Sequence, residues 1–231
     1  MIFLCPVFFF AGMSDKIGKE MEQIRVVMDM GRDDNFYQDT QVLLESVMQE
    51  LMLRVDLLRR HLVLKGYRDP VEHCKGRIKS ADSMIKKLEK KGFPITPESA
   101  LTKVYDAVGI RIVCQFVDDV YQMVDILKRQ EDIEIIKEKD YIENPKPNGY
   151  RSYHLIIRIP VHLPDCTRKL YAEIQIRTIA MDCWAALEHD LRYKKEVDNV
   201  ELLAEELKRC SDEMASTDLT MQTIRRVLRD K

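Results

Sequence analysis

The sequence predicts an α+β protein in which one mixed or antiparallel β-sheet is flanked by helices. Apolar residues recur at helical spacing near both ends of the 231-residue chain. Short segments rich in β-branched residues lie mostly between them, and no internal repeat or long linker divides the chain. Helices at both ends and strands in the middle are typical of a single sheet covered by helices.

Two helices are predicted in the first half of the chain. Apolar residues at three- and four-residue steps over residues 39–65 predict an amphipathic helix that ends at Gly66. The cationic segment HCKGRIKSADSMIKKLEKKG, residues 73–92, follows. Its spaced apolar residues, Ile78 among them, predict a second helix that stops at Gly92.

Four strands and three helices are predicted in the remainder. The segment Val108–Val117 is rich in β-branched residues and predicts a buried strand, and the helix after it has Asp118 or Asp119 as its expected cap. The other expected elements are strands at Ile133–Lys137, Ser152–Ile159 and Leu170–Arg177, a hairpin-type connection between the last two, and helices at Thr178–Lys195 and from about Val200 to the chain end.

The composition is that of an ordinary globular protein, with 45% apolar and 33% charged residues. The net charge of −2 creates no global basic field toward nucleic acid or membranes, so any anion site must be local. The six cysteines form no CxxC pair, which argues against a zinc site and against a disulfide-stapled secreted fold. Reduced thiols in the cytoplasm are therefore expected.

The N-terminal sequence MIFLCPVFFFAGMSDK carries the one targeting candidate. Its apolar run, Ile2–Ala11, is too short to span a bilayer and has no positively charged segment before it. We therefore expect no signal peptide. Translation starts at Met1 or at Met13, where MSDKIGKE has the polar character of an ordinary N-terminus.

Strand alternation gathers polar residues on one face of the predicted sheet. The residues that share a face are Glu173, Gln175 and Arg177 in one strand, Tyr150, Ser152 and His154 in a second, and Arg111 and Gln115 in a third. For an isolated strand, a solvent-exposed face would explain this pattern. Three such strands together imply a polar cleft on the sheet.

Two carboxylates are placed for metal binding. Asp106 directly precedes the first predicted strand and Glu173 lies within the fourth, and oxygen ligands of this kind suit Mg²⁺. Asp106 could instead be a cap or turn residue. The cationic residues that precede them are Lys79, Lys86 and Lys90 at helical spacing, with Arg77 and Lys87 close by. Such a set is either a solvated helix face or a site for a triphosphate.

The stretch KPNGYRSYH, residues 146–154, joins a turn to aromatic and cationic residues. Pro147-Asn148-Gly149 favours a turn, because proline presets the bend and glycine tolerates positive φ. A loop that carries such side chains at the start of a buried strand indicates binding.

Four segments resemble the RelA/SpoT family, specifically its small, stand-alone alarmone synthetases of the RelP or RelQ type. They are GRIKS, DAVGIRIVCQFVDD, KDYIENPKPNGYRSYHLII and AEIQIRTIAMDCWAALEH, in the family's order. The resemblance implies a nucleotidyltransferase-like synthetase core over residues 67–195, preceded by an N-terminal extension with helices over 1–66 and followed by a C-terminal oligomerisation helix over 196–231.

The resemblance also implies an activity and its residues. The family's enzymes are GTP pyrophosphokinases of the stringent response, which use Mg²⁺ to transfer the β,γ-pyrophosphate of ATP to the 3′-hydroxyl of GDP or GTP and commonly form homotetramers. Tyr150 would stack on the guanine, and Glu173 would be the candidate base. The implied positions are Arg77, Lys79, Lys87 and Arg111 for ATP, Lys146, Tyr150, His154, Gln175 and Arg177 for the acceptor, and Asp106 and Glu173 for catalysis and Mg²⁺.

Two alternatives stay open at this point: an inactive nucleotide- or RNA-binding regulator on the same fold, and a nucleotidyltransferase with another acceptor. The near-neutral charge and the acidic pair argue against the regulator. The HD dipeptide at His189-Asp190 has no further ligand set, so we expect no alarmone hydrolase activity. Lys139 stands where some relatives carry arginine, which leaves the choice between GDP and GTP open.

Overall fold

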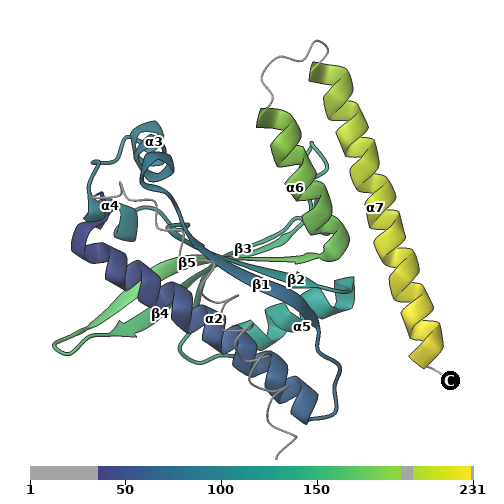
Figure 1. The fold of residues 1–231 in the computed structure, drawn as a ribbon, viewed down its shortest axis with the longest axis horizontal. Helices are drawn as coiled ribbons and strands as arrows, with labels where there is room; N and C mark the ends of the chain where they lie inside the picture. Colours follow the sequence, from purple (N-terminus) through teal and green to yellow (C-terminus); the bar gives the residue numbers. More distant parts are fainter. Residues whose placement is uncertain (1–35, 194–199, 230–231) are drawn as a thin grey trace, which may run out of the picture. The chain divides into compact units, whose positions relative to one another are not determined.

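The computed structural model describes residues 36–193 and 200–229, which form a five-stranded mixed sheet with helices packed against it (Figure 1). The predicted α+β class is confirmed. The strands are β1 (Val71–Ile78), β2 (Val108–Cys114), β3 (Glu134–Asp140), β4 (Tyr153–His162) and β5 (Thr167–Thr178). The helices are the 3₁₀ turn η1 (Gln38–Thr40), α2 (Gln41–Leu64), α3 (Ala81–Lys91), α4 (Pro97–Thr102), α5 (Val117–Lys128), α6 (Ile179–Tyr193) and α7 (Val200–Arg229).

Some predictions fall outside the described residues. These are the apolar run Ile2–Ala11, the two possible starts, Cys5, and the ends of the last two predicted helices. The five described cysteines, at positions 74, 114, 166, 183 and 210, carry free thiols. Among the described helices, none combines the length and the apolar character that crossing a membrane requires.

The strands are ordered β1-β2-β5-β4-β3. β2 and β5 are parallel, and the other neighbours are antiparallel. The expected hairpin between β4 and β5 is confirmed, because the two strands pair along their length up to His162 opposite Thr167. The parallel pair at the centre sets β5, which carries Glu173, Gln175 and Arg177, between β2 and β4.

One face of the sheet is apolar and is covered by α2 and α5 (Figure 1). Ile174 and Ile176 of β5 point into this layer and are fully buried. They belong to the same core as Leu51 of α2 and Met123 of α5. Each large side chain buried in this way contributes about 1.5–3 kcal/mol of hydrophobic stabilisation. The opposite face is therefore left for the polar side chains of the same strands.

The predicted helix over residues 73–92 is wrong in its first part. Residues up to Ile78 form β1, and α3 begins only at Ala81. Gly76 faces α2 so closely that an added Cβ would lie 2.7 Å from Cγ of Met48. Pairing with β2 and packing against α2 therefore decide this segment, because strand preference depends on the neighbours more than on local pattern.

The first turn of α5 also differs from the prediction. The strand before it ends at Cys114 rather than Val117, and the N-cap residue is Phe116, without a side-chain cap. Gln222 of α7 supplies the missing acceptor, because its side-chain oxygen lies 2.9 Å from the backbone nitrogen of Asp118. Asp119 is almost fully buried, and its carboxylate binds arginine side chains instead of capping its own helix.

Candidate active site

The polar face of the sheet brings together side chains from four strands. Pairing between strands places them in two rows across the sheet. One row contains Arg77 and Glu173, opposite one another across Gly109. The next row contains Arg111, Gln175 and His154. The expected gathering of polar residues on one face is therefore confirmed for these strands.

Asp106 lies just before β2 and is bound by two lysines. Its Oδ2 atom is 2.6 Å from Nζ of Lys87 and 3.1 Å from Nζ of Lys79. Burial opposes ionisation, yet the hydrogen bonds and charges of Lys87 and Lys79 lower the pKa of Asp106 below its usual range. The other oxygen, Oδ1, is buried and has no hydrogen-bond partner among the described residues. Asp106 is thus an ionised carboxylate with one oxygen still free to bind a ligand.

Glu173 is held by its neighbours on the sheet. Its Oε1 atom lies 3.0 Å from Nδ1 of His154, and its Oε2 atom accepts a 3.0 Å hydrogen bond from Nε2 of Gln175. Burial opposes ionisation here too, but the hydrogen bonds from His154 and Gln175 and the charge of Lys87 lower the pKa of Glu173 to about 2. Lys87 therefore acts on both carboxylates.

Tyr150 extends the hydrogen bonds of Glu173 toward the loop. The series Arg177, Tyr150, His154 and Glu173 is called the contact chain below. Its hydroxyl accepts a 2.6 Å hydrogen bond from Nη2 of Arg177 and lies 2.9 Å from Nε2 of His154. If the tyrosine proton is donated to Nε2, the Nδ1 proton of His154 points to Glu173. This direction satisfies every atom of the chain from the guanidinium to the carboxylate. The loop residue Tyr150 and the strand residue Glu173 are thus linked through a single imidazole.

The predicted turn is confirmed and places a cation beside two aromatic rings. Gly149 donates its backbone N–H to the carbonyl of Lys146 at 2.8 Å and has a φ of 90°. The Nζ atom of Lys146 lies 4.7 Å from the ring centre of Tyr150 and 4.8 Å from that of Tyr141. Lys139 lies 5.9 Å from the ring centre of Tyr141. This part of the site combines flat rings with positive charge, which suits a base that carries phosphates.

Asp182 is a site residue that sequence reasoning missed. It lies in the first turn of α6, and its carboxylate binds Arg177 at 3.1 Å and Arg111 at 3.3 Å. His73 of β1 lies 3.9 Å from the same carboxylate. Asp182 therefore neutralises part of the positive charge where β1, β2 and β5 meet. Its place five residues after Arg177, in the same sequence block, is the signal that could have identified it.

Three residues of the predicted polar and cationic sets lie outside the site. Gln115 lies beyond the end of β2, and its side chain binds Arg68 and Glu72 instead. Lys86 and Lys90 are exposed on α3. Lys79, Lys86 and Lys90 therefore do not form one helix face, because Lys79 precedes α3. Asp106 is instead bound by Lys79, in the segment between β1 and α3, and by Lys87 of α3.

The two carboxylates fit a magnesium ion better than they fit zinc. Among the described residues, no three His, Cys, Asp or Glu side chains are grouped to hold a metal. Mg²⁺ needs only one or two carboxylates, because water and substrate phosphates complete its shell. The free, buried Oδ1 of Asp106 and the ionised Glu173 meet that requirement.

Comparison with known families matches residues 76–198 to the region found in RelA/SpoT proteins. The chain is 49% identical over 144 residues to GTP pyrophosphokinase YwaC of Bacillus subtilis, which covers 62% of this chain and 69% of that protein. It is 32% identical over 193 residues to GTP pyrophosphokinase YjbM of the same organism, and this alignment covers 84% of this chain and 90% of that protein.

Solved structures with the same fold include two alarmone synthetases. The structure of small alarmone synthetase 1 from Bacillus subtilis bound to its product pppGpp has a TM-score of 0.75 and 32% identity, and the match covers 83% of this chain and 97% of that one. Small alarmone synthetase 2 from the same organism has a TM-score of 0.74 and 39% identity, with 82% and 97% covered.

Proposed function

Because this chain belongs to the RelA/SpoT family, we propose that it is a GTP pyrophosphokinase that makes ppGpp or pppGpp from ATP and GDP or GTP. The observation that carries the proposal is the arrangement of two chemically different groups on one face of the sheet. One is a carboxylate between lysines, and the other is an aromatic and cationic loop. Lys87, whose charge acts on both Asp106 and Glu173, and the contact chain from Glu173 to Tyr150 connect the two groups.

In this proposal the ATP binds on the side of β1 and α3. Lys79 and Lys87 supply mobile positive charges for its phosphates, and Arg77 and Arg111 supply planar guanidinium groups on the neighbouring strands. Phosphoryl-type transfer depends mainly on positioning and on neutralisation of charge. A relative, small alarmone synthetase 1 from Bacillus subtilis, has been solved bound to AMPCPP, an ATP analogue, which supports a nucleotide donor here.

The acceptor binds on the side of the turn. The ring of Tyr150 offers a flat surface for guanine, and Lys146 lies beside it to attract the acceptor phosphates. Arg177 and His154 hold the tyrosine hydroxyl, so the ring keeps its orientation before the acceptor arrives. Gln175 binds both Glu173 and Arg177, which ties this half of the site to the carboxylate.

Glu173 is ionised at neutral pH, and its role depends on that charge. A carboxylate with a pKa of about 2 is a weak proton acceptor at neutral pH, because an effective general base titrates near the working pH. Its permanent charge suits it better for holding Mg²⁺ together with Asp106. The ion, when bound, neutralises phosphate charge during the transfer. We therefore propose that Glu173 acts mainly through its charge.

Product analysis tests the proposal. The purified protein should convert ATP and GDP, with Mg²⁺, into AMP and a guanosine nucleotide that carries a pyrophosphate on its 3′-oxygen. Formation of ADP or free pyrophosphate without that product would contradict the assignment. A panel of other nucleotide acceptors separates it from a nucleotidyltransferase of different specificity. Incubation of ppGpp with the protein and Mn²⁺ should give no breakdown.

We also propose a cytoplasmic homotetramer. Free thiols suit the reducing cytoplasm. Large apolar side chains are exposed along two long helices, which favours burial against other copies. They are Leu53 and Leu57 of α2 and Leu219, Ile224 and Leu228 of α7. Light scattering at micromolar concentration should give about four times the monomer mass, and a monomer mass would contradict the proposal.

A further inference from the structure

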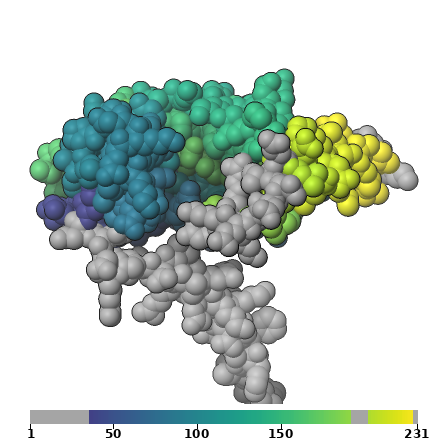
Figure 2. All heavy atoms as spheres, turned by 90° about the horizontal axis from the view of Figure 1, so that it is seen from above, coloured from purple at the N-terminus to yellow at the C-terminus, as the bar shows by residue number. Residues whose placement is uncertain are grey.

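The C-terminal helix α7 packs directly on the turn that carries Lys146 and Tyr150. The hydroxyl of Ser211 donates a hydrogen bond to the carbonyl oxygen of Gly149, and Ser211 is only 4% exposed. The contact leaves no room for a side chain on the turn, because a Cβ added to Gly149 would lie 2.7 Å from Cβ of Ser211 and 3.3 Å from Cα of Lys208. In Figure 2, α7 (yellow-green to yellow) lies beside green residues from the middle of the chain.

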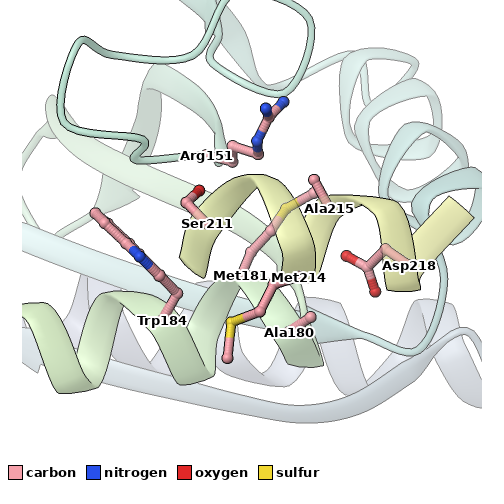
Figure 3. Close-up of a pocket in the computed structure, with 8 residues that line it drawn as sticks. All are labelled: Arg151, Ala180, Met181, Trp184, Ser211, Met214, Ala215 and Asp218. Carbon is pink, nitrogen blue, oxygen red and sulfur yellow. The ribbon is translucent and has the colours of Figure 1, made fainter. Parts of the chain in front are cut away.

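A second attachment fixes the chain just after the turn. Arg151 donates hydrogen bonds to the carbonyl of Ile142 and to Oδ1 of Asp212, each at 3.1 Å. Asp212 is itself held by Lys208, one helical turn earlier, at 2.9 Å. Arg151 and Ser211 also line a small pocket between α6 and α7, which Figure 3 shows together with Trp184 and Asp218. Two consecutive residues of α7, Ser211 and Asp212, thus hold both ends of a three-residue segment.

The segment between these two attachments contains Tyr150. Its backbone carbonyl accepts from the N–H of Lys146 at 3.1 Å, and its backbone N–H donates to the side chain of Asn148. A displacement of Gly149 or Arg151 would therefore move the ring of Tyr150 and the amine of Lys146 together. Lys79 follows β1, Lys87 lies on α3 and Asp106 precedes β2, and the contacts that join these three residues are made among themselves.

We propose that α7 is part of the acceptor pocket, with Ser211 as a positioning residue that fixes Tyr150 and Lys146 for the guanosine nucleotide, and Asp212 in support. This inference rests on the proposed function and extends the site beyond residue 198, where the family match ends. The loss of either α7 contact should weaken acceptor binding and leave ATP binding unchanged.

The test compares Ser211→Ala with the matched control Gln222→Ala. Both residues are buried on α7, and each side chain bonds the backbone of another element, but Gln222 bonds Asp118 at the start of α5 instead of the turn. Ser211→Ala should raise the KM for GDP about 3- to 10-fold, the loss expected for one hydrogen bond. Its kcat should change less, and its Kd for AMPCPP should stay within about two-fold. Gln222→Ala should lower the melting temperature without changing the KM for GDP.

Other outcomes overturn the inference. It fails if Ser211→Ala leaves the KM for GDP unchanged, or if both variants raise it equally, because the effect would then be one of general stability. Asp212→Asn, which alters an exposed contact to Arg151, provides a second test if Ser211→Ala does not fold, and it should raise the KM for GDP in the same direction. The wild-type protein in the same assay tests the proposed function separately, because that function fails only if the wild type forms no product.

Discussion

Replacing Glu173 by glutamine removes one charge from the centre of the proposed site and keeps the size of the side chain. The carboxylate now accepts hydrogen bonds from His154 and Gln175, one on each oxygen. An amide has one oxygen and one NH₂ group, so one of these two donors would face another donor. The substitution therefore disturbs the contact chain as well as the charge.

The charge that the substitution removes follows from the pKa of Glu173. Its surroundings lower that pKa from 4.5 to about 2. They therefore stabilise the anion over the neutral acid by about 3 kcal/mol, with the cost of burial already included. A neutral amide lacks the charge that the proposed Mg²⁺ site needs, and a roughly 100-fold fall in rate corresponds to about 2.7 kcal/mol, within the several kcal/mol that a bound metal ion supplies to the transition state. We expect kcat to fall about 100-fold or more.

Initial rates of alarmone formation, resolved by anion-exchange chromatography, measure this effect. Glu134→Gln is the matched control, because Glu134 is a half-buried carboxylate of β3 that pairs with Arg158 outside the site. It should keep its wild-type kcat. Calorimetric titration of AMPCPP with and without Mg²⁺ should show a smaller effect of the ion in Glu173→Gln than in the wild type. If Glu173→Gln retained most of its kcat, the placement of this carboxylate at the reaction centre would be refuted.

Two further predictions concern the loop and the response to pH. Tyr150→Ala should raise the KM for the acceptor with ATP affinity unchanged, because one stacked base contributes about 1–3 kcal/mol, and Tyr150→Phe should have a smaller effect because it keeps the ring. An equal loss of ATP binding in Tyr150→Ala would contradict the assignment. The lowered pKa of Glu173 stabilises the folded protein above about pH 4.5, and this stabilisation is lost as the pH falls toward 2. In urea unfolding, the difference in the free energy of unfolding between wild type and Glu173→Gln should therefore shrink as the pH falls. A difference that stays constant with pH would contradict the lowered pKa of Glu173.

Local pattern was sufficient for several features of the site. Alternation in β5 assigned Glu173 and Gln175 to one face and Ile174 to the other, because successive side chains of a strand point in opposite directions whatever the tertiary context. The turn before Tyr150 was also predictable from local sequence, because proline fixes its own φ angle and glycine tolerates positive φ whatever the tertiary context. The four family segments could be read without any knowledge of their contacts.

The features that the sequence did not predict depend on partners far away in the chain. The segment ending at Ile78 has helical spacing, and only pairing with β2 makes it a strand. Asp182 became a site residue because α6 places it against Arg111, 71 positions earlier. The cap of α5 comes from Gln222, 104 positions later, and the contact of Ser211 with Gly149 joins residues 62 positions apart. Backbone periodicity is a property of neighbouring residues and is visible in the sequence, whereas contacts of this kind exist only after the chain topology has brought separate elements together.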